Sequence, residues 1–189
     1  YDLRFLNLEE TSNEESLKNK ELLNLKKTAI YAKHEQAERF FHLTQLELEQ
    51  NKHKKALINI QLACELEPSN KTYKNKIEEI SKLIKKAEAH KAYFQALEKY
   101  KTKLYKEARS DLNNAISKNG NEADYYYLYG LTYFEQDLNL KKAEEYFKKA
   151  ISLNQKKPDY YIPLSKIYLK MDLKPLATEI LAKSLKINP

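Results

Sequence analysis

The sequence predicts an all-α protein, a solenoid of stacked antiparallel helical hairpins, from three observations. Glycine and proline are scarce, with 2 and 5 among 189 residues, which argues against turn-dense β folds and glycine-rich phosphate-binding loops. Apolar residues recur at spacings of three and four, as they do along one face of an amphipathic helix. The same order of large and small apolar residues returns along the chain, and such repetition is typical of solenoids.

The repetition is clearest between two segments of equal length, Phe40 to Pro68 and Tyr161 to Pro189. Two further copies differ from them by one extra and one missing residue, which we place in the turn between the two helices of each copy. Because one hairpin of amphipathic helices cannot bury both its faces, the copies must stack. The recurring positions are Phe40, Leu43, Thr44, Ala56, Ile60 and Ala63; Tyr93, Ala96, Leu97, Tyr100, Ala108, Leu112 and Ala115; Tyr126, Tyr129, Gly130, Tyr133, Ala143, Phe147 and Ala150; and Tyr161, Leu164, Ser165, Tyr168, Ala177, Leu181 and Ser184.

This pattern resembles that of the tetratricopeptide repeat family, whose signature runs aromatic, Leu, Gly, Tyr, Ala, Phe, Ala and Pro. The third copy meets it most fully, through Gly130 and Phe147, whereas Thr44 and Ser165 stand in place of the glycine in the first and last copies. Glu47 replaces the tyrosine of the signature in the first copy. The resemblance covers residues 37–68 and 89–189, and it implies about four repeats together with capping helices.

A long helix is expected in the middle of the chain. Residues 71–104 contain neither glycine nor proline, and their apolar stripe changes face between Ala87 and Tyr93. We therefore expect one helix over about residues 71–103, whose first half covers the first hairpin and whose second half opens the second repeat. A break near His90 is the alternative.

Two units follow from this organisation. The first, residues 1–86, holds an N-terminal helix, the first hairpin and its covering helix. The second, residues 87–189, holds three further repeats. Ser12 and Glu15 form a capping-box pattern, so we expect the N-terminal helix to begin near Glu14 and to cap the outer face of the first repeat.

The resemblance implies a non-enzymatic protein–protein interaction scaffold, which binds a peptide or helix of a partner in a concave groove lined by the first helix of each repeat. The groove positions fall on Phe94, Tyr127, Leu131, Phe134, Ile162 and Lys166. The alternative is that these rings only pack between neighbouring helices. The Lys and Asn clamp with which some family members hold acidic chaperone tails is absent, because residues such as Phe41 and Glu98 take its positions.

The charge of +7 at pH 7 raises a second hypothesis, nucleic-acid or anion binding through a lysine-rich helical face at residues 71–91. All 34 cationic residues except Arg4, Arg39 and Arg109 are lysines. Arginine is the residue suited to bidentate recognition of phosphates and bases, so nucleic acid is not the expected partner.

Nothing in the sequence points to catalysis, a metal or a cofactor. Cys64 is the only cysteine, and none of the four histidines is paired at metal-ligand spacing with another. No apolar stretch approaches the length of a membrane span. We therefore expect a protein that is not an enzyme, has no catalytic residues, metal or cofactor, and is located in the cytoplasm.

Both ends of the sequence invite expectations about neighbours. Residues 1–6 look like the tail of a J-domain, and residues 37–73 are similar to repeat regions that follow J-like domains in bacterial proteins. This weaker resemblance implies the partner-binding arm of a co-chaperone-like protein with an upstream domain. At the other end, Leu181, Leu185 and Ile187 have no following helix to pack on, so we expect self-association through the C-terminal helix edge.

Overall fold

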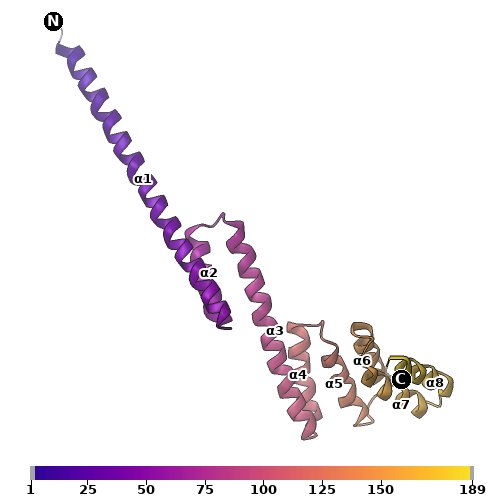
Figure 1. The fold of residues 1–189 in the computed structure, drawn as a ribbon. Coiled ribbons are helices and arrows are strands. Elements are labelled where there is room, and N and C mark those ends of the chain that lie inside the picture. The colour runs from indigo at the N-terminus through magenta and orange to yellow at the C-terminus, as the bar shows by residue number, and fades with distance from the viewer. Residues whose placement is uncertain (1–2, 188–189) are drawn as a thin grey trace. The chain divides into compact units, whose positions relative to one another are not determined.

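The computed structural model describes the backbone of residues 3–187 and the side chains of residues 16–187. Within this part the regular structure is entirely helical, so the all-α prediction is confirmed (Figure 1). The helices are α1 (Leu3–Glu49), α2 (His53–Leu66), α3 (Lys71–Lys101), α4 (Tyr105–Lys118), α5 (Ala123–Phe134), α6 (Leu140–Leu153), the 3₁₀ turn η1 (Pro158–Tyr160), α7 (Tyr161–Lys170) and α8 (Lys174–Ile187).

The contacts divide the chain into two units, Tyr1–Ile84 and Lys85–Pro189. The sequence analysis places this division between residues 86 and 87. Helix α3 is continuous through His90, and its residues belong to both units.

In unit 1, the C-terminal part of α1 forms a hairpin with α2, and the first half of α3 packs on that hairpin (Figure 1). Three alanines at the contact allow the helices to approach closely, and they are fully buried: Ala37, Ala56 and Ala63. The hydroxyl of Tyr73 on α3 donates to Glu38 Oε1 on α1 at 2.6 Å, which ties the covering helix to the hairpin.

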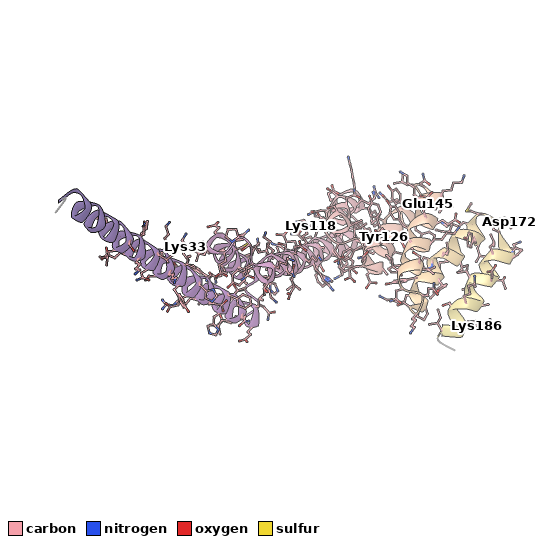
Figure 2. The ribbon with its side chains drawn as sticks, turned by 90° about the horizontal axis from the view of Figure 1, so that it is seen from above. Lys33, Lys118, Tyr126, Glu145, Asp172 and Lys186 are labelled. Atoms are coloured by element: carbon pink, nitrogen blue, oxygen red, sulfur yellow. The ribbon has the colours of Figure 1, made fainter. Side chains whose placement is uncertain are left out.

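The turn inside each of the four hairpins has the same backbone conformation. One residue adopts a left-handed conformation with φ between 53° and 62°, although none of the four is glycine. Beside Asp172, which is labelled in Figure 2, the amide of Asp172 donates to Leu169 O at 3.1 Å and that of Leu173 donates to Tyr168 O at 2.8 Å. These bonds form a Schellman motif and satisfy carbonyl groups at the end of the first helix. The left-handed residues are Asn51, Lys103, Asp137 and Asp172.

This common turn fixes the register of the repeats and corrects the sequence alignment of the second copy. Counted back from the left-handed residue, Tyr93 rather than Phe94 takes the position of Tyr127, and Ala96 rather than Leu97 takes the position of the family's glycine. In this register the second copy lacks no residue, because Ala92 takes the position of Phe40, Tyr126 and Tyr161, whereas the sequence analysis assigns that position to Tyr93 and a missing residue to the turn. The residues at the glycine position are small and buried in every copy: Thr44, Ala96, Gly130 and Ser165.

In unit 2, the hairpin of α5 and α6 packs the ring of Phe147 directly against Gly130. Phe147 is fully buried, and a Cβ atom added at Gly130 would lie 2.7 Å from Phe147 Cε1, closer than side-chain atoms approach each other in proteins. Glycine at this position thus makes room for a large ring on the second helix. The other copies place smaller residues at the position of Phe147, namely Ile60, Leu112 and Leu181.

The N-terminal cap predicted from the sequence is not formed. Helix α1 begins at Leu3 and runs unbroken to Glu49, so the predicted capping box lies inside the helix rather than at its start. Every residue from 16 to 36 is exposed, whereas burial begins at Ala37 where α2 meets the helix. The residues between 14 and the mid-30s continue the first helix of the first repeat, because no glycine, proline or turn sequence interrupts them.

Burial of tyrosines in unit 2 predicts a loss of stability at alkaline pH. Desolvation, with smaller effects of Glu135 and Glu122, raises the pKa of Tyr100 and that of Tyr125 to about 12 each, above the usual value of 10.0. Since the folded state holds these protons more tightly, their stabilising effect is complete below about pH 10 and is lost as the pH rises toward 12.

We therefore expect tyrosinate absorbance and loss of helical circular dichroism to rise together above about pH 10. Tyr125→Phe should shift this transition to higher pH, because phenylalanine keeps the buried ring and has no proton to lose. Tyr31→Phe is the control, since Tyr31 is 78% exposed, and it should leave the transition in place. An alkaline transition unchanged by Tyr125→Phe would contradict the prediction.

Candidate functional site: a groove along α5 and α7

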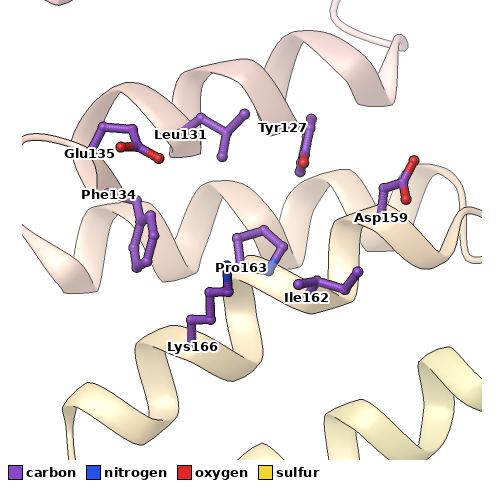
Figure 3. A pocket seen from close by; sticks show the side chains of 8 residues that line it. All are labelled: Tyr127, Leu131, Phe134, Glu135, Asp159, Ile162, Pro163 and Lys166. Carbon is purple, nitrogen blue, oxygen red and sulfur yellow. The ribbon is translucent and has the colours of Figure 1, made fainter.

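A pocket of about 170 Å³ lies in unit 2 between α5, η1 and α7 (Figure 3). It is lined by Tyr127, Leu131, Phe134, Glu135, Asp159, Ile162, Pro163 and Lys166. Five of the six groove residues predicted from the sequence are among them. The helical spacing of three and four brings Tyr127, Leu131 and Phe134 onto one face of α5, and the same spacing brings Ile162 and Lys166 onto the facing side of α7.

Tyr127 is held in place by two neighbouring rings. Its centroid lies 5.8 Å from that of Phe147 and 5.0 Å from that of Tyr160, within the range of favourable aromatic contacts. Burial, followed by the charges of Asp159 and Asp124, raises the pKa of Tyr127 above its ordinary value. The pocket therefore has one rigid wall that presents an aromatic face.

Tyr160, which supports Tyr127, is itself anchored by an acidic residue. Its hydroxyl donates to Asp124 Oδ1 at 2.7 Å, and Lys157 Nζ donates to the same oxygen at 2.6 Å. Tyr160 is only 1% exposed. This cluster fixes the turn before α7 against the start of α5 and so fixes the width of the pocket at that end.

The other end of the pocket is formed by Phe134. The ammonium group of Lys170 lies 5.0 Å from the centre of its ring, and the same ammonium group pairs with Asp137 Oδ1 at 2.6 Å. Phe134 thus both lines the pocket and makes a cation–π contact with Lys170. Ile162 and the neighbouring Leu169 are 42% and 52% exposed, so apolar surface continues from the pocket along α7.

Phe94, the sixth predicted residue, does not line this pocket. It is 60% exposed on α3 and lines a separate hollow formed by α3 alone. The register set by the turns instead places Tyr93, Leu97 and Tyr100 at the positions of Tyr127, Leu131 and Phe134. All three are partly buried in the core beneath α5, where Tyr93 stacks on Tyr125 at 5.1 Å.

Three lining residues are not among those named from the sequence. Glu135 directly follows Phe134, and the helical spacing from Leu131 is a signal that identifies it. Asp159 and Pro163 lie on either side of Ile162 in the sequence, but their approach to the pocket depends on the 3₁₀ turn at Pro158–Tyr160, which the sequence analysis does not predict. The two carboxylates, together with Lys166, place charges of both signs around an apolar floor.

The lysine-rich segment is partly neutralised by nearby carboxylates. Lys76 Nζ pairs with Glu79 Oε2 at 2.7 Å, and Lys86 Nζ lies 3.5 Å from Glu122 Oε1. These are surface ion pairs of small individual worth, but they reduce the net charge that the segment presents. Within residues 16–187, no group of three metal-ligating side chains is found.

No helix in the described part of the chain has an apolar stretch long enough to cross a membrane.

The comparisons with known proteins agree with the repeat pattern. The family model named tetratricopeptide repeat matches residues 123–157, which span α5, α6 and the turn that follows. A search of curated protein sequences finds no match to the chain.

Solved structures share the fold at low sequence identity. The tetratricopeptide repeat domain of OM64 from Arabidopsis has a TM-score of 0.53 and 20% identity, with 56% of this chain and 86% of that chain covered. The second such domain of Spaghetti (RPAP3), bound to the HSP90 peptide SRMEEVD, has a TM-score of 0.54 and 15% identity over 57% of this chain and 98% of that chain. YrrB, described as having an unusual peptide-binding site, has a TM-score of 0.50 and 20% identity over 86% of this chain and 92% of that chain.

The stacked hairpins, the small residue at each close helix contact and the pocket between first helices define a helical-repeat protein. The fold is that of the tetratricopeptide repeat solenoid, and the segment at residues 123–157 matches the family model of that repeat.

Proposed function

We propose that unit 2 binds a short extended segment of a partner protein across α5 and α7, over the pocket lined by Tyr127, Leu131 and Phe134. The main observation in support is that apolar and aromatic side chains of α5 and α7 converge on an open surface at this pocket. Ile162 is 42% exposed, although an isoleucine is stabilised by burial. A ligand side chain placed against these residues removes that apolar surface from water, and the ring of Tyr127 is already held in the required position.

The chemistry of the lining favours an apolar segment over an acidic tail. The groove positions hold tyrosine, leucine, phenylalanine and isoleucine, and Lys166 is the only cation among the lining residues of the pocket. The carboxylates of Glu135 and Asp159 would repel a peptide rich in glutamate and aspartate. RPAP3 and YrrB support peptide binding by this fold, through the peptide and the peptide-binding site that their titles describe.

A peptide selected from a phage-displayed random library against the intact chain provides the probe. With a fluorescent copy of this peptide, Phe134→Ala and Ile162→Glu should each raise the Kd at least about tenfold, because they remove or charge a central contact. Phe94→Ala is the control, an exposed aromatic position outside the pocket, and it should leave the Kd unchanged. Both test residues are on the surface or at its edge, and circular dichroism checks that each variant is folded.

The outcomes separate the two candidate functions. Selection of no pocket-dependent peptide would overturn the proposal, as would tight binding of the acidic peptide SRMEEVD that depends on Phe134. Binding of RNA or DNA that vanishes at high salt and is unaffected by either pocket variant would instead favour the lysine-rich face at residues 71–91.

We further propose that this module acts by binding alone, in the cytoplasm, as the partner-binding arm of a co-chaperone-like protein. This part of the proposal rests on the resemblance of residues 1–6 and 37–73 to sequences that follow J-like domains. The sequence of the full gene product tests it directly. A His-Pro-Asp motif in a domain preceding Tyr1 is the expected result, and an unrelated upstream sequence would remove the co-chaperone role without affecting the groove.

A further inference from the structure

The exposed part of α1, residues 16–36, carries leucines that no other described helix covers. Leu22 is 50% exposed and Leu25 is 68% exposed, and Ala29 and Ala32 continue the same stripe. Figure 2 shows the side chain of Lys33 extending from this stretch. An isolated helix of this length is only marginally stable in water, because tertiary packing normally supplies most of the stability of a helix. A partner for this stripe is therefore expected.

The spacing of the stripe is that of a coiled-coil seam. Leu22, Leu25, Ala29 and Ala32 are separated by three, four and three residues, which places them at alternating a and d positions of two heptads. The neighbouring stripe of Leu23 and Ile30 cannot form the seam, since its d positions would bury Lys26 and Lys33.

The charges beside the seam identify the occupant as a second copy of the same helix in parallel orientation. Glu21 occupies a g position and Lys26 occupies the following e position. In a parallel in-register pair, residue g of one helix lies beside the next e residue of the other, so Glu21 meets Lys26 of the second copy on both sides of the seam. Thr28 and Lys33, the next such pair, bring no like charges together.

The antiparallel arrangement brings like charges together instead. There, g residues face g residues and e residues face e residues, so Glu21 would face Glu35 and Lys26 would face Lys26 of the other copy. The stretch ends where Gln36 precedes Ala37, the first residue covered by α2. The preceding d position is Lys18 and the following a position is Gln36, so the apolar seam is confined to the residues between them. We infer that residues 19–35 of α1 form a short parallel two-stranded coiled coil that dimerises the protein.

Sedimentation velocity of the intact chain over a wide range of concentration tests the dimer. The wild-type chain should show a reversible monomer–dimer equilibrium, and Leu25→Glu should abolish it. Leu17→Glu is the matched control, because Leu17 is 61% exposed on the same helix but lies at an outer c position. It should leave the equilibrium unchanged. Leu185→Glu, at the exposed C-terminal edge, should also have no effect.

A charge exchange tests the orientation. Glu21→Lys and Lys26→Glu should each weaken self-association by on the order of tenfold, because each replaces two attractive contacts with two repulsive ones. A mixture of the two variants should associate with each other as well as the wild-type chain does with itself. Simple loss of helix stability cannot produce this recovery.

Several results would overturn the inference. A wild-type monomer at every concentration, an equal effect of Leu17→Glu, or failure of the mixed variants to associate would each do so. Loss of the dimer in Leu185→Glu alone would assign self-association to the C-terminal edge. Flotation of the chain with anionic phospholipid vesicles, abolished by Leu25→Glu in a protein that stays monomeric, would assign the stripe to a membrane surface.

Discussion

Replacement of Phe147 with alanine is expected to lower the free energy of unfolding of unit 2 by about 3–5 kcal/mol. The ring is fully buried and contacts both Gly130 and Tyr127. Its loss removes apolar contact area and leaves a cavity, because Gly130 has no side chain that could fill the space. Denaturant unfolding followed by circular dichroism measures the change.

Two further substitutions on α6 serve as references for Phe147→Ala. Glu145→Ala alters an exposed residue of the same helix and should change stability by less than about 0.5 kcal/mol. Phe147→Leu should have an intermediate effect, since Leu181 occupies the matching position of the last hairpin. A loss below about 1 kcal/mol for Phe147→Ala would show that α5 and α6 do not pack as the structure describes.

Replacement of Gly130 with alanine is expected to destabilise unit 2 by about 1–3 kcal/mol, although alanine is the better helix former by about 1 kcal/mol. The added Cβ would stand 2.7 Å from Phe147 Cε1, so either the ring or the helix must move. Over-packing therefore outweighs helix propensity at this position. Thermal and denaturant unfolding of the two proteins measure the sign directly.

A double variant isolates the cause. Gly130→Ala should be tolerated much better in a Phe147→Leu background, because the smaller side chain leaves room for the methyl group, as at Ser165 and Leu181. Ser165→Ala is the control at the equivalent position. The change is small, since it loses only the hydrogen bond from Ser165 Oγ to Ile162 O at 2.7 Å. Equal costs in both Phe147 backgrounds would exclude steric conflict as the reason.

The fold class can be predicted from the sequence because the residues at close helix contacts are small in every copy. Ala56, Ala108, Ala143 and Ala177 recur at one place in the second helices, and all are buried. The close approach of the two helices requires a small residue at this position. The alanines therefore recur in all four copies, although the aromatic residues differ between the copies. The register of the second copy was not predictable in the same way, because Ala92 stands where the other copies have Phe40, Tyr126 and Tyr161. The next residue, Tyr93, is aromatic and was aligned with them instead.

The N-terminal helix shows a different limit of sequence reasoning. Ser12 and Glu15 fit a capping box, but such a pattern only permits a helix start, and nothing before Ser12 interrupts a helix. An apolar stripe does not reveal whether its partner lies in the same chain. The stripe of α1 faces no helix of the described hairpin, so the assumption of an intramolecular cap was wrong.

The groove was largely predictable because its residues lie on regular helices at spacings that the family pattern sets. Tyr127, Leu131 and Phe134 follow from the position of Tyr126 alone. Asp159 and Pro163 were not predictable, because both depend on η1, where the hydroxyl of Tyr160 donates to Asp124, a residue distant in sequence. Tertiary contacts of this kind leave no periodic signal in a sequence.

The left-handed turns at Asn51, Lys103, Asp137 and Asp172 bear on how the chain folds. Each turn closes its helix pair through backbone bonds between residues no more than five positions apart. A hairpin can therefore form from contacts that are local in sequence, and local contacts lower the entropy that must be lost before packing begins. Folding is then expected to be rapid and to begin at more than one hairpin, so a growing chain emerging from the ribosome could acquire structure one repeat at a time.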